Sequence, residues 1–360
     1  PLAKLLIASP LLPHVEAFAN IVGAVISSNE LPFFPYYTDH GVNHINAVLS
    51  AEADLIPSEV LTNSTLKAKH RLMNDRDAVL IIGATLLHDL AMHLHPAGFL
   101  ELISEGSRFK PLPWFCEDQS CYSADQAWCI LWDAYQREAR RFSTKTLENI
   151  VGQKAVQQGW CYTGLDNDSG LWTEYDRLVI GEFIRRHHAR LAHEIAVYGF
   201  PGLPTKDAVD AFPAIGSDKA HPLHGLSDLI GVTARSHWLS LRTCKTYLDS
   251  TFTASPRQLG TLSLYAMALL RVADYFQIDS QRAPAVLLQL RHPQSPLSVQ
   301  EWQKHIAVRS IDGAIDPRGK MVTIDHNIGL IRFLQISELL ANLQSELDHS
   351  TAVLDRKSVV

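Results

Sequence analysis

Ala84-Thr85-Leu86-Leu87-His88-Asp89-Leu90-Ala91-Met92 places an adjacent histidine and aspartate at the end of an apolar run. The run from Ala78 to Leu87 predicts a buried helix. An ionisable pair directly after such a helix is expensive to bury, and a metal ion would offset that cost because both side chains can coordinate it. Since a carboxylate has two oxygens, Asp89 could also bridge two metals. The alternative is a His–Asp hydrogen bond at the end of a core helix, so ligands elsewhere in the chain decide between the two.

The composition indicates a folded protein. The 360 residues are 46% hydrophobic and 19% charged, enough for one large domain or two small ones with real cores. The net charge of −6 argues against broad nonspecific binding to nucleic acid, although a local basic groove remains compatible with it. Five cysteines without a CxxC spacing indicate reduced thiols, so we expect a cytoplasmic protein. No apolar run is long enough for a membrane helix, and because the chain starts at Pro1 we expect the natural protein to be longer.

Two histidines are expected side by side on one helix. Thr38 or Asp39 is a suitable N-cap for a helix that runs from His40 to about Leu55. Residues four apart share a helix face, so His40 and His44 lie one above the other. One histidine on an apolar face is usually a hydrogen-bonded core residue. Two at this spacing are typical of metal ligands and of the residues that support them.

A second long helix is expected from about Trp172 to Tyr198, with Arg185-Arg186-His187-His188 in its middle. Two arginines beside two histidines are a poor choice for simple packing. They suit a site that binds a metal and an anion together. From the residues alone, either His187 or His188 could be the ligand.

Two further histidines carry weaker signals. His93 lies four residues after Asp89, so it can sit beside that carboxylate and face a substrate, but a plain surface histidine fits equally well. His237 lies among apolar residues on a helix expected from Leu226 to about Tyr247. Alone, it would indicate nothing about function.

Asp274 lies within the last apolar helix of the expected core, from Gly260 to about Arg282. Aspartate is a weak helix former and is rarely buried unpaired, so its place there needs a reason. A salt bridge to an arginine is the structural explanation, and metal ligation is the functional one. Arg271, Asp274 and Arg282 fall along one helix face.

The pattern changes from about Ile306. Apolar residues on both sides of Asp316-Pro317-Arg318-Gly319 predict a short β-hairpin, and an amphipathic helix follows that packs on the domain or pairs with a partner chain. We therefore divide the chain into a helical metal-binding domain (1–305), a hairpin appendage (306–326), a C-terminal helix (327–349) and a tail or linker (350–360).

In chain order, the candidate ligands on predicted helices are His44, His88-Asp89, His188, His237 and Asp274. This H…HD…H…H…D order, over most of the chain from about Tyr36 to Arg282, resembles the HD superfamily of metal-dependent phosphohydrolases. With the hairpin included, the match resembles a large bacterial HD module that is sometimes joined to an Hsp90-like ATP-binding module. The resemblance implies an all-α, HD-type helical bundle with the metal site inside it. Met92 stands where the HD-GYP branch has a lysine, which weakens an assignment as a cyclic-di-GMP phosphodiesterase.

The resemblance also implies the roles of the ligands. By position, the residues that match the central metal set are His44, His88, Asp89 and Asp274. His188, which precedes Ala189 as in the family pattern, and His237 match the ligands of a second metal. Imidazoles and carboxylates suit a divalent transition metal, here two ions of Mn, Fe, Ni, Co or Zn, with Mg as a further candidate.

The predicted function is hydrolysis of a phosphate ester in a nucleotide or nucleotide-like substrate by metal-activated water. The residues expected to act in catalysis are His88, Asp89, His40 and Arg185. The residues expected to contact substrate are Arg185, Arg186, His93, Arg271 and Arg282, although arginines near an acidic site also serve in structural ion pairs. The alternatives are a nuclease for single-stranded DNA or RNA and a metal-binding regulatory module that gates a partner ATPase. We expect no membrane association, and a homo-oligomer or a further C-terminal domain through residues 327–360.

Overall fold

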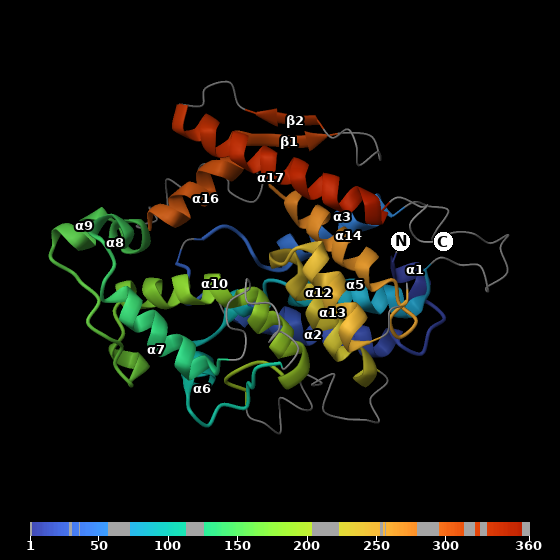
Figure 1. The fold of residues 1–360 in the computed structure, drawn as a ribbon, viewed down its shortest axis with the longest axis horizontal. Coiled ribbons are helices and arrows are strands. Elements are labelled where there is room, and N and C mark those ends of the chain that lie inside the picture. The colour runs from blue at the N-terminus through green and yellow to red at the C-terminus, as the bar shows by residue number, and fades with distance from the viewer. Residues whose placement is uncertain are drawn as a thin grey trace.

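The computed structural model describes residues 2–28, 31–35, 37–56, 73–112, 126–203, 223–252, 255, 257–278, 295–312, 321–324 and 330–354. Within these residues the fold is mostly helical, as the sequence predicts (Figure 1). The α-helices are α1 (Leu2–Leu6), α2 (Leu12–Ser28), α3 (Val42–Leu55), α5 (Asp75–Leu87), α6 (Pro96–Ile103), α7 (Trp128–Ala139), α8 (Thr144–Val151), α9 (Gln153–Gln157), α10 (Glu174–Tyr198), α12 (Ser227–Arg235), α13 (Leu241–Thr251), α14 (Ser263–Tyr275), α16 (Pro296–Ala307) and α17 (Leu330–Leu354). Single turns of 3₁₀-helix are η2 (Leu90–His93), η4 (Ser169–Leu171), η5 (His224–Leu226) and η6 (Ser236–Trp238).

Helix α5 lies at the centre of the core, where α3, α12 and α14 pack against it and α10 packs against α12. Its sequence is apolar on nearly every side, and a helix of that kind must be covered all round. A capping box starts it, in which Asn74 accepts from the backbone N–H of Asp77 and Asp77 accepts from that of Asn74. The Asp77 carboxylate also accepts from the backbone N–H of Leu262 at 2.6 Å, which ties α5 to the start of α14.

Glycines let two pairs of segments approach closely. A Cβ atom on Gly231 of α12 would lie 2.3 Å from the His193 ring of α10, so the contact between these helices depends on the missing side chain. A Cβ atom on Gly181 of α10 would lie 2.3 Å from the carbonyl oxygen of Phe33. Helix α10 carries His188 of the candidate site, and α12 leads directly into η6, which carries His237.

The C-terminal elements lie at the top of the view in Figure 1, where α17 packs against α14. Strands β1 (Val308–Asp312) and β2 (Met321–Ile324) pair antiparallel. The turn expected at 316–319 lies outside the described residues, so the hairpin as a unit stays a prediction. Helix α17 continues to Leu354, beyond the end expected near 349. None of the described helices is both long and apolar enough to cross a bilayer.

Three helix boundaries differ from the sequence-based expectation. Helix α3 begins at Val42, after Gly41, so His40 precedes the helix instead of opening it. The helix expected from Leu226 to Tyr247 is interrupted by η6, because Ser240 accepts from the backbone N–H of Thr243 and caps a new helix. The glycine, proline and serine content of residues 98–125 predicts irregular structure, but α6 begins at Pro96 and continues to Ile103, since proline is well suited to the first helical position.

Candidate metal centre

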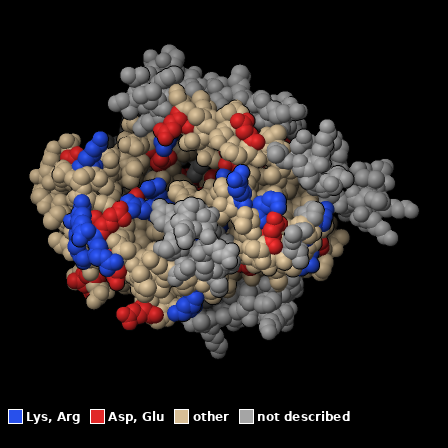
Figure 2. Space-filling model, viewed as in Figure 1, with Lys and Arg blue, Asp and Glu red and all other residues tan. Residues whose placement is uncertain are grey.

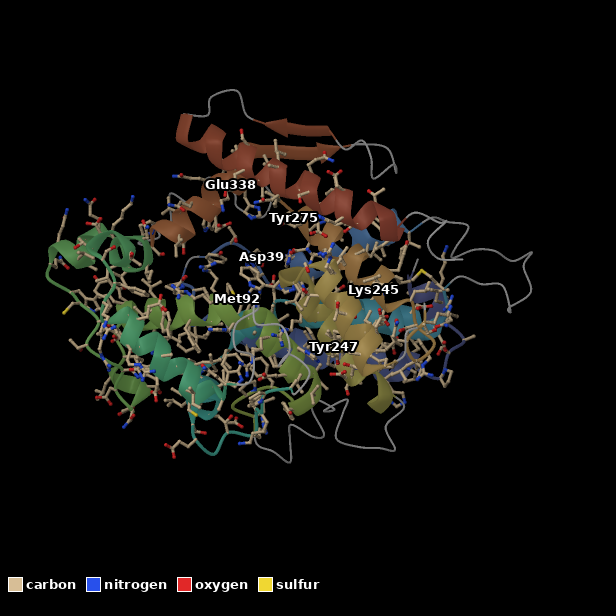
Figure 3. All side chains as sticks on the ribbon, in the orientation of Figure 1. Asp39, Met92, Lys245, Tyr247, Tyr275 and Glu338 are labelled. Carbon is tan, nitrogen blue, oxygen red and sulfur yellow. The ribbon has the colours of Figure 1, made fainter. Side chains whose placement is uncertain are left out.

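Segments far apart in the sequence meet at one cluster of imidazoles and carboxylates. Its members are His44 of α3, His88 and Asp89 after α5, His188 of α10, His237 of η6 and Asp274 of α14. They form two groups, His44-His88-Asp274 and Asp89-His188-His237, and within each group the ligand atoms lie within 4.8 Å of one another. In Figure 3, Asp39, Met92 and Tyr275, which neighbour these segments in the sequence, lie near the middle of the molecule. All the ligands expected from the sequence are therefore brought together.

Asp89 belongs to both halves of the cluster. Its Oδ2 atom lies 3.2 Å from His88 Nε2 and 3.4 Å from His44 Nε2. Its Oδ1 atom lies 3.8 Å from His188 Nε2, on the other side. The backbone leaves helical geometry at Asp89, with φ −107° and ψ 2°, which lets two consecutive side chains turn to one centre. The carboxylate is placed to bridge two cations.

The first half of the cluster is closed by Asp274. The Nε2 atoms of His44 and His88 are 3.2 Å apart, and Asp274 Oδ1 lies 3.4 Å from the former and 3.9 Å from the latter. Both histidine side chains are fully buried, whereas the Asp274 side chain is 30% exposed. Solvent therefore reaches the cluster on the Asp274 side.

The second half contains two imidazoles with their Nε2 atoms face to face, 2.8 Å apart in His188 and His237. The Nδ1 atom of His188 donates to the carbonyl of Arg185 at 2.8 Å, and that of His237 donates to the carbonyl of Ala234 at 2.6 Å. Carbonyl oxygens only accept, so in the neutral rings both Nε2 atoms carry lone pairs. Two lone pairs at this distance repel each other unless a cation lies between them.

The first half uses the same local support. His88 donates from Nδ1 to the carbonyl of Thr85 at 2.7 Å. Hydrogen bonding of the outer nitrogen fixes the tautomer of a metal-binding histidine. In three histidines of the cluster this partner is the carbonyl three residues earlier, so each ring is oriented by its own helical turn.

The protonation of the two halves differs. Burial lowers the pKa of His88, but the carboxylates of Asp89 and Asp274 outweigh it and raise that pKa to about 9. Burial raises the pKa of Asp89, but the His88 charge and hydrogen bonds from His44 and His88 hold it well below its usual range. Burial lowers the pKa of His188, and burial and the neighbouring His188 charge lower that of His237 to about 4. Without metal, His88 thus carries a proton beside the Asp89 and Asp274 carboxylates, whereas the rings of His188 and His237 are neutral.

The donor set fits divalent metal ions. Two imidazole nitrogens on one ion, each at about 2.1 Å and about 90° apart, would be separated by about 3 Å. The Nε2 separations of 3.2 Å and 2.8 Å are of this size. Nitrogen and carboxylate ligands suit transition metals, and no sulfur lies among the ligand groups of the described residues. The clustered residues could hold one ion in each half, with Asp89 between them.

His40 and His93 lie at the edge of the cluster. The Nε2 atom of His40 is 3.8 Å from Asp89 Oδ2, and its Nδ1 atom donates to the carbonyl of Thr38 at 2.9 Å. His93 is buried and donates from Nε2 to the backbone carbonyl of His40 at 3.0 Å. His93 therefore supports the segment that carries His40.

The neighbouring arginines face different parts of the structure. Arg185 donates from Nε and Nη2 to the two carboxylate oxygens of Glu182 at 2.8 and 2.9 Å. Arg186 donates to Glu182 and to Glu138, and its guanidinium lies 5.2 Å from the centre of the Tyr135 ring, on the side of α7. The Arg185 charge lies close enough to His188 to contribute to the lowering of its pKa, so Arg185 is the one of the two that stays near the cluster.

Arg271 is held by protein groups. It donates to the backbone carbonyls of Ser236 and Leu239, on either side of His237, and pairs with Glu346 of α17. Arg282 lies outside the described residues.

The choice between the two adjacent histidines of α10 follows from their directions. The His188 ring faces Asp89 and His237. The His187 ring packs at 4.8 Å from Phe183 and 5.9 Å from Trp128, and burial together with the charges of nearby arginines lowers its pKa to about 3. His187 points into the apolar core, away from the cluster.

Glu52 is a buried acid that the sequence analysis missed. It lies on α3, two helical turns after His44, and both carboxylate oxygens lie within 3.0 Å of the Thr85 hydroxyl. Burial raises the pKa of Glu52 to about 8, despite the Thr85 contact. Thr85 in turn donates to the carbonyl of Ile81 at 2.9 Å. The sequence did contain a signal for Glu52, because it lies eight residues after His44 and residues at that spacing lie on broadly the same face of a helix.

Trp238 is a second residue that the sequence analysis passed over. Its ring centre lies 5.2 Å from that of His188, and the residue is 51% exposed. At the other end of the cluster, the Tyr37 ring lies 5.2 Å from His40. Aromatic side chains thus border the cluster on both sides.

Comparison with known proteins gives one family. A model of the family described as HD-CE matches residues 34–349, which include every residue of the cluster. No curated protein and no solved structure matches the chain.

Proposed function

The chain belongs to the HD-CE family, and we propose that it is a metal-dependent hydrolase that cleaves a phosphate ester of a nucleotide. The observation that carries this proposal is the pair of ligand groups joined by the two oxygens of Asp89. Two metal ions that share a carboxylate are a common arrangement for in-line attack on phosphorus. Two divalent ions would also outweigh the two carboxylates of the cluster, and the excess positive charge would attract a phosphate.

Bound metal would supply a water of lowered pKa and charge stabilisation of the phosphate oxygens. The chain supplies the rest. The side chains of His44 and His88 are fully buried, so they would hold metal on the core side of the cluster, and the exposed side of Asp274 leaves an approach for substrate. His40 is suited to proton transfer, because its Nδ1–H is held by Thr38 and its Nε2 is directed towards Asp89.

Arg185 is the arginine best placed to contact the phosphate. Its described hydrogen bonds use Nε and Nη2, so its Nη1 donors are the ones that a phosphate oxygen would meet. Glu182 fixes the guanidinium in one orientation and remains ionised, since the arginine hydrogen bonds and charges outweigh burial and lower its pKa. In this proposal Glu182 holds Arg185 so that the Nη1 donors of the guanidinium face the approaching phosphate.

Trp238 supports the choice of a nucleotide as substrate. A half-exposed tryptophan against His188 offers a flat face to a planar group attached to the bound phosphate. Stacking of a base on an aromatic ring is worth about 1–3 kcal/mol. On the face drawn in Figure 2, basic and acidic side chains of the described residues are interspersed around a hollow, which favours a small substrate over a long polyanion.

The test is a turnover screen with Mn, Co, Ni and Mg against nucleoside monophosphates, cyclic dinucleotides and single-stranded DNA and RNA. Within the positive class, a nucleotide is compared with the matching ribose phosphate, which lacks the base. The wild-type chain should prefer the nucleotide by roughly 5- to 150-fold in kcat/KM, from the stacking free energy. Trp238→Ala should lose this preference, and Trp238→Phe should retain part of it. Hydrolysis in none of these reactions would refute the proposed function, and equal rates with both substrates would refute the role of Trp238.

A further inference from the structure

A contact between the C-terminal helix and the metal centre runs through Arg271. This residue lies on α14, one turn before Asp274, and its side chain is only 11% exposed. One end of its guanidinium donates from Nη1 to the carbonyls of Ser236 and Leu239. The other end donates from Nε to Glu346 Oε1 at 2.6 Å and from Nη2 to Glu346 Oε2.

The two carbonyls belong to the segment that carries His237. Helix η6 is a single turn, closed by one backbone hydrogen bond of 3.0 Å from Leu239 to Ser236. A single 3₁₀ turn has little stability of its own, and its carbonyls carry partial negative charge. Arg271 binds the carbonyls on both sides of His237, so it fixes the backbone from which that imidazole reaches His188.

Glu346 in turn orients Arg271. The carboxylate is nearly buried in α17, and it also accepts from the Ser350 hydroxyl at 2.8 Å. Burial opposes its ionisation, but the Arg271 hydrogen bond and charge hold its pKa below the usual range. The fork of the guanidinium matches the two carboxylate oxygens, so its plane is set by the position of α17.

Among the described residues, α17 also packs on α14 through apolar side chains. Its buried Leu343 packs with Val272 and Phe276 of α14 in a small apolar cluster that is separate from the main core. The buried Arg271–Glu346 pair adds a directional, charged contact to this apolar packing of α17 on α14.

We propose that Arg271 and Glu346 are positioning residues for the second half of the metal centre, which is complete only when α17 is docked. This inference rests on the dinuclear site of the proposed function, but not on turnover. Because binding couplings are reciprocal, a metal ion at His188 and His237 should also hold α17 in place.

The experiment measures Mn²⁺ binding by calorimetry on the full chain. Glu346→Gln keeps the shape of the side chain but removes its charge, and Arg271→Lys keeps the charge but removes the fork. Each should weaken the second Mn²⁺ equivalent by about 10- to 100-fold, as expected when the support of a ligand is lost, and leave the first within about twofold. Hydrogen exchange in α17 should slow on adding Mn²⁺ to the wild type and not in the variants.

Asp77→Asn is the matched control. It also removes a buried carboxylate that joins two helices, with Arg257 as its charged neighbour, but none of its described contacts is to a ligand of the cluster. It should lower the melting temperature and leave both Mn²⁺ affinities unchanged. The inference is overturned if the Arg271 and Glu346 variants bind both equivalents like the wild type, or weaken them no more than the control does.

The result of this Mn²⁺ titration can be distinguished from the result of the turnover screen that tests the proposed function. A wild-type chain that binds two Mn²⁺ ions but hydrolyses nothing refutes the hydrolase and leaves the positioning pair testable by the same titration. A wild-type chain that binds a single ion overturns the pair. Should Arg271→Lys not fold, Glu346→Gln decides, because an amide can accept one hydrogen bond from the arginine and is the milder change.

Discussion

His237→Ala should cost the chain one of two metal equivalents, while the ion held by His44, His88 and Asp274 stays. The imidazole of His237 contributes only to the second half, where its Nε2 atom lies 2.8 Å from that of His188. Alanine leaves that half with one imidazole and the shared carboxylate of Asp89. The first half keeps all its ligand atoms and loses only the ring contact of His88 with His237.

The size of the effect follows from linkage. At a free metal concentration 100 times the dissociation constant, each occupied site stabilises the folded chain by about 2.7 kcal/mol. The 360-residue chain should have an unfolding entropy of about 2.1 cal/mol/K per residue, so each ion should raise the melting temperature by roughly 3–4 °C. The wild type should therefore gain roughly twice the shift of the variant. Without metal, the variant should lose about 1 kcal/mol from the missing hydrogen bond to Ala234.

The assay combines elemental analysis with thermal unfolding in the presence and absence of Mn²⁺. His187→Ala is the matched control, because that histidine neighbours a ligand on α10 but packs against Phe183 and Trp128. It should lose stability from its packing and keep both metal equivalents. Two equivalents and a full thermal shift in His237→Ala would refute the assignment of the second half.

Two further predictions concern the core around the centre. Burial raises the pKa of Glu52 from 4.5 to about 8, so its contribution to stability is fully present below pH 4.5 and is lost as the pH rises through about 8. In chemical denaturation of the metal-free chain, the wild type should lose up to about 1.4 kcal/mol per pH unit relative to Glu52→Gln in this window, and parallel curves would contradict a buried neutral acid. Gly181→Ala should destabilise the fold by about 1–3 kcal/mol, because its Cβ would meet the Phe33 carbonyl. Gly23→Ala, in open space on α2, should instead add about 0.5–1 kcal/mol, and equal unfolding free energies for the two variants would show that the close approach does not matter.

The candidate ligands could be predicted from the sequence because several of them sit in strong local patterns and because their order resembles that of the HD superfamily. His88 and Asp89 end an apolar helix, and Asp274 is an acid within another, so each conflicts with simple burial. His237 had no such signal. The position of His237 depends on an interruption of the helix between Arg235 and Leu241. Sequence periodicity does not reveal this interruption, because a single 3₁₀ turn barely changes the apolar spacing.

The roles of the arginines depended on partners that lie far away in the sequence. The spacing puts Arg186 beside a ligand, but Glu138, 48 residues earlier, draws it to the other side of α10. Arg271 shares a face with Asp274, but its partner Glu346 lies 75 residues later. Periodicity predicts the helix face on which an arginine lies. The position of its guanidinium group then depends on an acidic partner far away in the sequence.

The carbonyl contacts of His88, His188 and His237 mean that the orientation of each ring and the position of each ring are determined separately. The orientation of each ring is fixed by a hydrogen bond within four consecutive residues. The tertiary fold then has only to bring these short segments together. A substitution elsewhere that shifts a whole helix should then abolish metal uptake while every ligand keeps its rotamer. Imidazole proton signals in NMR would stay at their native positions in such a variant, and would separate displaced ligands from misdirected ones.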